Sequence, residues 1–276
     1  MYEFLSNLLS DKDNGILPFE ALSLSHILYL ILIFGLIILV LFLYKNKTQK
    51  AKEKLINVTV SVALCAYIAD FFLMPFSYGY IDIDKLPFHL CTSMSIMCFL
   101  SRHNNILSKY KKTFTIMGFI GALMYIVYPA GVAKADGYSY RIVQTVLYHG
   151  LMIAQGVFAI AFNDLDLSFK GLKYDIIAII TLTIWAMLGN TLYSGVVKET
   201  CTCVEGCIHE ITIYDNDFNW FFFKHDDLYI MTDDIDIYFA PFIMISVIFG
   251  MCALVRFISL KLEKVFNKDE KQIKTV

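Results

Sequence analysis

The chain has 276 residues, of which 58% are hydrophobic and 15% aromatic, and its mean hydropathy is +0.61. Charged residues make up 17%, below the roughly 25% typical of soluble domains. A soluble fold would leave more apolar surface than one core can bury, and the net charge of −2 favours neither nucleic acid nor a broad anionic surface as a partner. We therefore expect a polytopic helical membrane protein whose partners are membrane lipids.

Seven apolar segments approach the ~20 residues that a helix needs to cross a bilayer. The third is short and weakly apolar, so it would be the first to fail a hydropathy threshold. The pattern predicts an all-α fold in which residues 1–276 form a single membrane domain of seven transmembrane helices. The expected spans are residues 22–44, 55–76, 86–100, 114–132, 141–162, 176–197 and 238–260.

Basic residues fall in alternate connections between these spans and in the tail. Lysine and arginine gather at residues 45–54, 102–112 and 170–173 and in the tail at 261–276, whereas the other connections are acidic or nearly neutral. Basic loops tend to stay in the cytoplasm. A cytoplasmic C-terminus and an odd number of spans put the N-terminus outside, and every basic connection then lies on one side.

The long connection at residues 198–237 is predicted to lie outside the cytoplasm. Its cysteines and histidine follow the pattern C-x-C-x3-C-x-H, through Cys201, Cys203, Cys207 and His209. Zinc accepts such ligands, but the spacing matches no standard structural site, so a disulfide such as Cys201–Cys207 is favoured over a metal. Farther along, residues 211–223 form either a β-hairpin or an aromatic lid on the membrane interface.

Four spans carry a polar side chain in the outer half of the membrane. A rise of ~1.5 Å per residue places Cys91 about 8 Å and His149 about 12 Å from the outer ends of their spans. Asp70 and Asn190 fall at a similar depth. Ionisable groups at membrane depth are costly, which makes function the default explanation. The structural alternatives are a cysteine that only fills space and polar groups that only join neighbouring helices.

Helical spacing indicates which of these groups face each other. Arg141, Thr145 and His149 recur at i, i+4 and i+8, on one face of their span. His89 and Cys91 are two residues apart and therefore face different directions on a regular helix. We expect His149 to be the base for Cys91, with His89 in a separate binding or orienting role. Pro87 suits the first helical position, so Cys91 lies where a helix N-terminus favours a thiolate.

The string Leu86-Pro87-Phe88-His89-Leu90-Cys91 resembles the LPxHLC signature of YwaF-like bacterial integral membrane proteins. Later elements appear in the same order at residues 118–129, 148–150 and 189–190, and the similarity covers about residues 22–260. That family is distantly similar to transmembrane protein 164, an acyltransferase that moves fatty acyl chains between phospholipids. The resemblance implies a bacterial plasma membrane, Cys91 as an acyl-thioester carrier and His149 as its partner.

The leading hypothesis is a lipid acyltransferase in which His149 takes the proton of Cys91 and the thiolate attacks a phospholipid ester. The remaining polar residues receive supporting roles. Asn190 or His89 would stabilise the oxyanion, Asp70 would orient His149, and Arg141, with Thr145 on its face, would hold a lipid phosphate. No phosphate loop, dinucleotide fingerprint or HExxH motif is present, so we expect no cofactor and no metal. The alternatives are a transporter or receptor-like protein for a small polar ligand, or a structural membrane protein.

Overall fold

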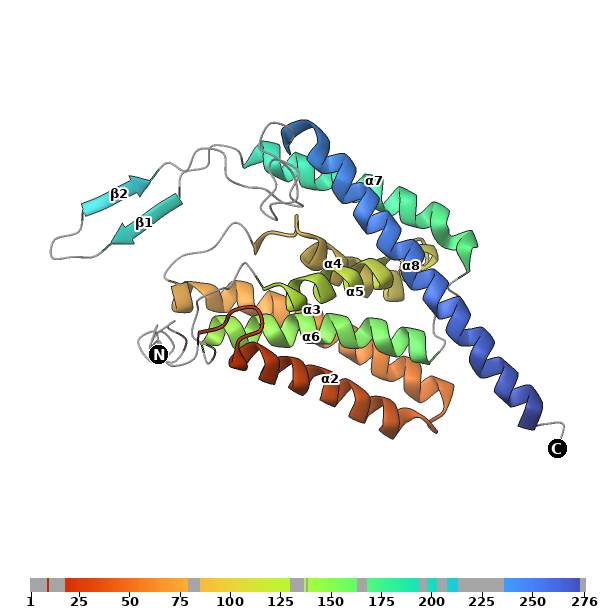
Figure 1. Ribbon diagram of the computed structural model, residues 1–276. Helices are drawn as coiled ribbons and strands as arrows, with labels where there is room; N and C mark the ends of the chain where they lie inside the picture. Colours follow the sequence, from red (N-terminus) through yellow and green to blue (C-terminus); the bar gives the residue numbers. More distant parts are fainter. Residues whose placement is uncertain are drawn as a thin grey trace.

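A computed structural model gives the arrangement of the chain. It describes residues 9, 18–78, 85–129, 137, 139–162, 168–193, 198–202, 208–212 and 236–273. The described helices are α2 (Leu24–Tyr44), α3 (Gln49–Tyr78), α4 (Leu90–His103), α5 (Lys111–Val127), α6 (Tyr140–Ala161), α7 (Leu172–Leu192) and α8 (Asp236–Ile273), with the 3-10 helices η2 (Leu107–Tyr110) and η4 (Phe169–Gly171). The expected helical class is confirmed, and helices α2 to α8 follow the predicted spans in chain order (Figure 1).

Among the described residues, five helices are long and apolar enough to cross a membrane. They are Leu24–Tyr44, Gln49–Leu73, Tyr140–Ala161, Phe169–Leu192 and Phe242–Lys261. Helices α4 and α5, with 14 and 17 residues, fall short of this measure. The protein is therefore a multi-pass membrane protein, while the predicted count of seven spans stays a prediction.

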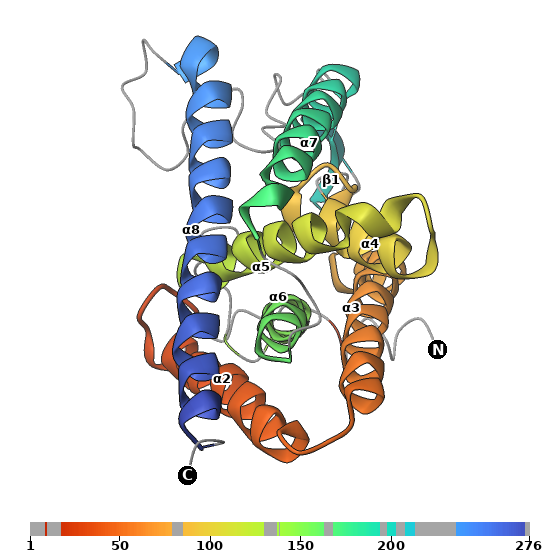
Figure 2. The ribbon, with the colours of Figure 1, turned by 90° about the vertical axis from the view of Figure 1, so that its right-hand side faces the viewer.

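Helix α6 is the centre of the bundle. Figure 2 views it almost along its axis, and α2, α3 and α5 all contact it. Within its span 72% of the residues are buried, against 11% in α2, so α6 forms core and α2 faces lipid. Glycines allow this close packing, because a Cβ on Gly156 would lie 2.6 Å from the Cβ of Phe119 on α5. Ser139 begins α6 by accepting a hydrogen bond from the backbone N–H of Ile142.

A buried ion pair joins α7 and α8 to the rest of the bundle. The Arg256 guanidinium donates to both carboxylate oxygens of Asp175 at 2.7 and 2.8 Å, and both side chains are fully buried. Thr113 on α5 donates to the same carboxylate at 2.6 Å, and Arg256 also donates to the backbone carbonyl of Ser168. Because every charged group here has several partners, the network holds three helices in a fixed arrangement.

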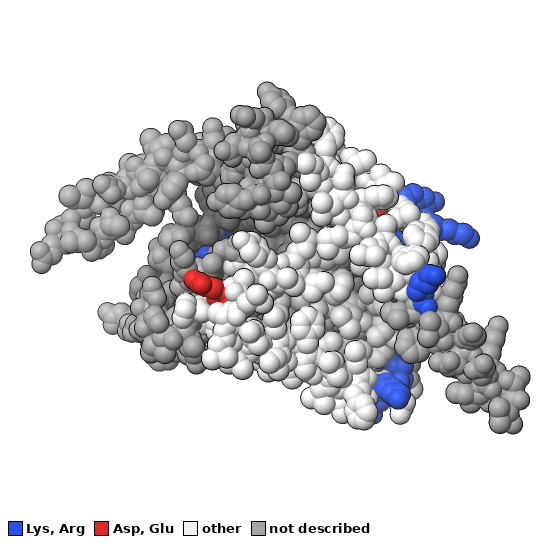
Figure 3. Space-filling model, in the orientation of Figure 1, with Lys and Arg blue, Asp and Glu red and all other residues white. Residues whose placement is uncertain are grey.

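The basic connections lie together at one end of the bundle, as the sequence predicts. On the face that Figure 3 shows, most of the visible lysine and arginine side chains of the described residues lie at that end. Hydrogen bonds join the helix ends there: Gln49 donates to the carbonyl of Phe162 at 3.1 Å, and Arg102 donates to Asn57 at 3.0 Å. The opposite end holds the first residues of α4 and α6 and the last residues of α5.

The long connection contains a two-stranded antiparallel sheet, formed by β1 (Lys198–Thr202) and β2 (Ile208–Thr212). Its register pairs Cys201 with His209. This sheet is not the predicted hairpin over residues 211–223. Ile211 and Thr212 belong to β2, which pairs with the earlier strand β1. Residues 213–223 and Cys207 lie outside the described residues, so the Cys201–Cys207 disulfide stays a prediction.

Candidate functional site

The segment that leads into α4 is held by contacts from three helices. Tyr67 on α3 donates to the backbone carbonyl of Lys85 at 2.8 Å. The carbonyl of Pro87 accepts two hydrogen bonds, from Ser93 Oγ at 2.6 Å and from Trp185 Nε1 on α7 at 2.7 Å. Non-helical backbone at membrane depth needs such donors, because lipid offers none. The segment before the cysteine is therefore fixed rather than free.

Phe88 fits against α7 because Gly189 has no side chain. The ring of Phe88 stacks on Trp185 with 4.8 Å between ring centroids. A Cβ on Gly189 would lie 2.5 Å from the Cδ1 of Phe88, well inside van der Waals contact. Asn190, the next residue, is 5% exposed at the end of α7. The glycine at this position thus sets the distance between α7 and the segment that precedes Cys91.

Helix α4 begins at Leu90, with His89 as its N-cap residue in extended conformation. The prediction that Pro87 starts the helix is wrong, because Pro87 lies two residues before the N-cap. Cys91 nevertheless lies in the first turn, where backbone N–H groups have no carbonyl partner within the helix. An N–H group at a helix start is suited to stabilising negative charge on sulfur.

The surroundings of Cys91 come from α5 and α6. A Cβ on Gly121 of α5 would lie 3.2 Å from the Cys91 sulfur, so the thiol rests directly on that glycine. The hydroxyl of Tyr148 on α6 donates to the Cys91 carbonyl at 2.9 Å. Cys91 is only partly buried, unlike Cys98, which is 0% exposed.

His149 is a buried histidine whose tautomer follows from its hydrogen bond. Its Nδ1 lies 2.8 Å from the backbone carbonyl of Thr145, one turn earlier on α6. Because a carbonyl only accepts hydrogen bonds, Nδ1 carries the proton in the neutral ring, which leaves the Nε2 lone pair to accept one. The ring stacks on Tyr125 of α5, with centroids 4.1 Å apart and planes 4° apart. The imidazole is thus held in one orientation.

Cys91 of α4 and His149 of α6 pack against the same face of α5, about one turn apart along it. Gly121 touches the thiol and Tyr125 stacks on the imidazole, and these two residues are four apart on α5. Four residues span about 6 Å of helix axis. Within the described residues no hydrogen bond joins the thiol to the ring; what relates the two groups is their contact with neighbouring turns of α5. Their predicted pairing stays a prediction.

Asp70 has a different partner from the one expected. The carboxylate is 2% exposed, and its oxygens accept from Lys85 Nζ at 3.1 Å and from the Tyr140 hydroxyl at 3.1 Å. The expectation that Asp70 orients His149 is therefore corrected, because the Thr145 carbonyl does so. Asp70 instead ties the segment before α4 to α3 and α6.

Lys85 and His89 both belong to the segment that leads into α4, and His89 is its N-cap residue. The N-cap has extended backbone, so helical spacing does not apply to His89, and its predicted separate role stays a prediction. Arg141 is half-buried in the first turn of α6. Lys85 and Tyr148 were missed in the sequence, although a lysine beside LPFHLC and a tyrosine beside His149 are visible signals.

No group of three or more histidine, cysteine, aspartate or glutamate residues within the described part of the chain is arranged to hold a metal ion. The arrangement offers instead a thiol at a helix start, an imidazole with one free nitrogen, and a lysine nearby. These groups can perform nucleophilic and acid–base chemistry without a metal.

The fold and site define a multi-pass helical membrane protein with a polar centre between α4, α5 and α6. The family model of the TMEM164 family matches residues 21–259, so the chain belongs to the TMEM164 family. This match does not test the expected YwaF-like bacterial branch. Comparisons with curated proteins and with solved structures gave no significant match.

Proposed function

We propose that this protein is a membrane acyltransferase that carries a fatty acyl chain as a thioester on Cys91, with His149 as the acid–base residue. The observation that carries the proposal is the pair of side chains on one face of α5. A partly exposed thiol rests on Gly121, and an imidazole with a free Nε2 stacks on Tyr125 one turn away. A nucleophile and a base on neighbouring helices supply the two groups that acyl transfer through a thioester requires.

In the first half-reaction the Cys91 thiol gives its proton to Nε2 of His149, and the thiolate attacks an ester carbonyl of a phospholipid. The tetrahedral intermediate then breaks its C–O bond, and the leaving lysophospholipid oxygen takes the proton back from His149. Cys91 is left as a thioester. Side-chain rotation closes the gap between sulfur and Nε2, as catalytic hydrogen bonds often tighten only when substrate binds.

In the second half-reaction a lysophospholipid hydroxyl gives its proton to His149 and attacks the thioester. The C–S bond breaks, and the Cys91 sulfur recovers the proton. One ester is exchanged for another, so the cycle needs neither nucleotide nor cofactor. We assign Lys85 and Arg141 to the lipid phosphate and His89 or Asn190 to the oxyanion, because Lys85 and His89 lie in the segment next to Cys91 and Arg141 lies in the first turn of α6.

The proposal includes a topology of seven spans in a bacterial plasma membrane, with the C-terminus in the cytoplasm. Support for it comes from the basic connections at one end of the bundle. Helices α4 and α5 would cross as a buried pair, since α5 packs against α4, α6 and α8 and need not be strongly apolar. The site then lies in the outer half of the membrane.

The test uses purified protein in nanodiscs, a labelled phospholipid donor and an unlabelled lysophospholipid acceptor. We expect Cys91→Ala to abolish label transfer and His149→Ala to slow it by about 10² to 10⁴-fold, the usual contribution of a general base. Cys65→Ala removes an exposed thiol on α3 and is the matched control, which should retain wild-type transfer. Undiminished transfer by folded Cys91→Ala would overturn the proposal.

A further inference from the structure

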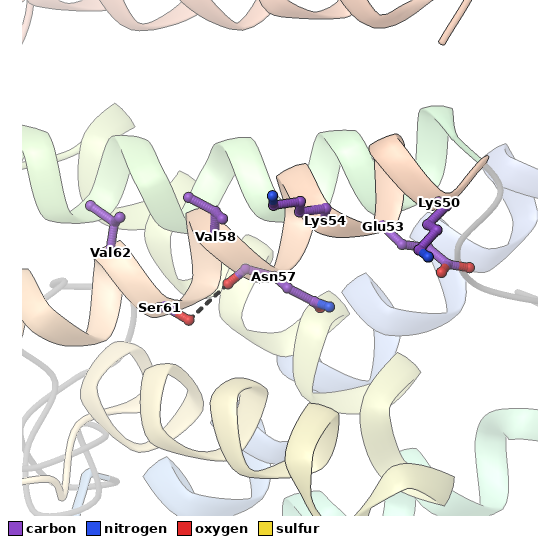
Figure 4. Close-up of a pocket in the computed structure, with 7 residues that line it drawn as sticks. All are labelled: Lys50, Glu53, Lys54, Asn57, Val58, Ser61 and Val62. Atoms are coloured by element: carbon purple, nitrogen blue, oxygen red, sulfur yellow. Dashed lines mark hydrogen bonds between the residues drawn. The ribbon is translucent and has the colours of Figure 1, made fainter. Parts of the chain in front are cut away.

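A groove lies along the first part of α3, at the basic end of the bundle. Its volume is about 440 Å³, and it is open to one side because every residue that lines it belongs to α3. Residues 50–62 of α3 line it (Figure 4). Figure 2 shows α2 and α3 on different sides of α6, and Val58 and Val62 on this face of α3 are exposed.

The lining residues change from charged to apolar along the helix axis. Lys50, Lys54, Val58 and Val62 are spaced four residues apart and form one row on α3. Each step of four residues goes about 6 Å deeper along the axis. The row therefore starts with two ammonium groups and ends with two valines that are 49% and 45% exposed. This is the order of groups along a phospholipid, from headgroup to chain.

The second row of the groove is made of Glu53, Asn57 and Ser61. Ser61 Oγ donates to the backbone carbonyl of Asn57, and the Asn57 side chain accepts from Arg102 of α4 at 3.0 Å. These polar groups are thus occupied within the protein, and they hold the Arg102 guanidinium beside the groove. The cations outnumber the single carboxylate of Glu53, so the charged end of the groove is positive.

We propose that this groove binds an anionic phospholipid, with its phosphate between Lys50 and Lys54 and one acyl chain along Val58 and Val62. Charge complementarity identifies the headgroup, because basic residues at a membrane surface attract anionic lipids. The N-terminus of α3, at Gln49, adds the positive end of its helix dipole. The exposed valines identify the occupant as a lipid rather than a soluble anion.

The groove is separate from the candidate reaction centre. Lys54 and Asp70 are 16 residues apart on α3, which corresponds to about 24 Å along its axis. A lipid held at the basic end therefore lies in the opposite membrane leaflet from Cys91 under the proposed topology. The groove acts as a binding site for a non-reacting lipid, and its existence does not depend on acyl transfer.

Native mass spectrometry of the detergent-purified full chain tests this inference. The protein is titrated with phosphatidylglycerol and with phosphatidylcholine of the same chains. We expect phosphatidylglycerol to be retained preferentially, and Lys50→Gln/Lys54→Gln to weaken it by about fivefold or more, the effect of losing one or two basic contacts. Lys45→Gln/Lys47→Gln removes the same charge from the adjacent connection and should change retention less than twofold.

Four results would overturn the inference. Equal weakening of phosphatidylglycerol retention by both lysine double variants would mean that the basic end attracts anionic lipid without a specific site. Equal retention of the two lipids would remove the headgroup preference. Displacement of phosphatidylglycerol by millimolar glycerol 3-phosphate would mean that the groove binds a free phosphate ester instead of a lipid. Retention of the preference in Val58→Asn/Val62→Asn would likewise contradict the placement of the acyl chain.

Discussion

Replacing Gly189 with alanine is expected to inactivate the protein while leaving it folded. The added Cβ would lie 2.5, 2.6 and 2.8 Å from three ring atoms of Phe88. That ring stacks on Trp185, and the neighbouring carbonyl of Pro87 is held by two hydrogen bonds. The ring therefore cannot turn aside alone, and the whole segment before Cys91 must move.

The size of the effect follows from these distances. Carbon atoms in contact prefer a separation of about 3.5 Å or more, so the segment must shift by about 1 Å. Overpacking of this kind costs about 1–3 kcal/mol of stability. A displacement of about 1 Å at reacting groups can lower a rate by about 10²-fold. We therefore expect acyl transfer to fall by about two orders of magnitude with only a modest loss in unfolding temperature.

The assay combines label transfer in nanodiscs with thermal unfolding in detergent. Gly35→Ala and Gly250→Ala are matched controls, since a Cβ at either position meets no atom within 4 Å. Both should keep wild-type transfer and stability. Normal transfer by Gly189→Ala would refute the argument that Phe88 and α7 position the cysteine, and equal loss in the controls would point to a general effect of glycine replacement.

Three further substitutions probe contacts seen in the structure. Arg256→Met leaves Asp175 buried without its counter-charge and should lower the free energy of unfolding in detergent by about 3–5 kcal/mol. Adding Asp175→Leu should restore much of that stability. A double variant less stable than Arg256→Met would contradict this reasoning. Tyr148→Phe removes the hydrogen bond to Cys91, costing about 1 kcal/mol, and should slow transfer more than it lowers the unfolding temperature. Trp185→Phe keeps an aromatic ring but loses one donor to Pro87, so transfer should fall less than in Gly189→Ala; a larger loss would contradict this ranking.

The helical class and the order of helices were predictable because apolar runs and basic connections are properties of the sequence alone. Hydropathy alone does not decide how many of the helices cross the membrane, since α4 and α5 are short and their burial depends on neighbouring helices. The site was partly predictable. The hydrogen bond between His149 and the Thr145 carbonyl follows from the i, i+4 spacing that the sequence displays, although a carboxylate partner was expected instead.

Other contacts depend on packing between distant segments. Asp70 pairs with Lys85 because the segment before α4 folds back on α3, and no pattern within α3 reveals that. Helical spacing does not decide where His89 points, because His89 precedes the helix as its N-cap residue. The contact between Phe88 and Gly189 joins residues 101 positions apart. Such contacts require the tertiary structure.

The intact mass of the purified protein, measured after incubation with a phospholipid of one acyl type, tests the central claim most directly. The account predicts that wild-type protein and Cys65→Ala gain the mass of one acyl group, that hydroxylamine removes it, and that peptide mapping places it on Cys91. Cys91→Ala should gain no such mass. A hydroxylamine-sensitive adduct that persists in Cys91→Ala, or no adduct on wild-type protein that turns over lipid, would contradict it.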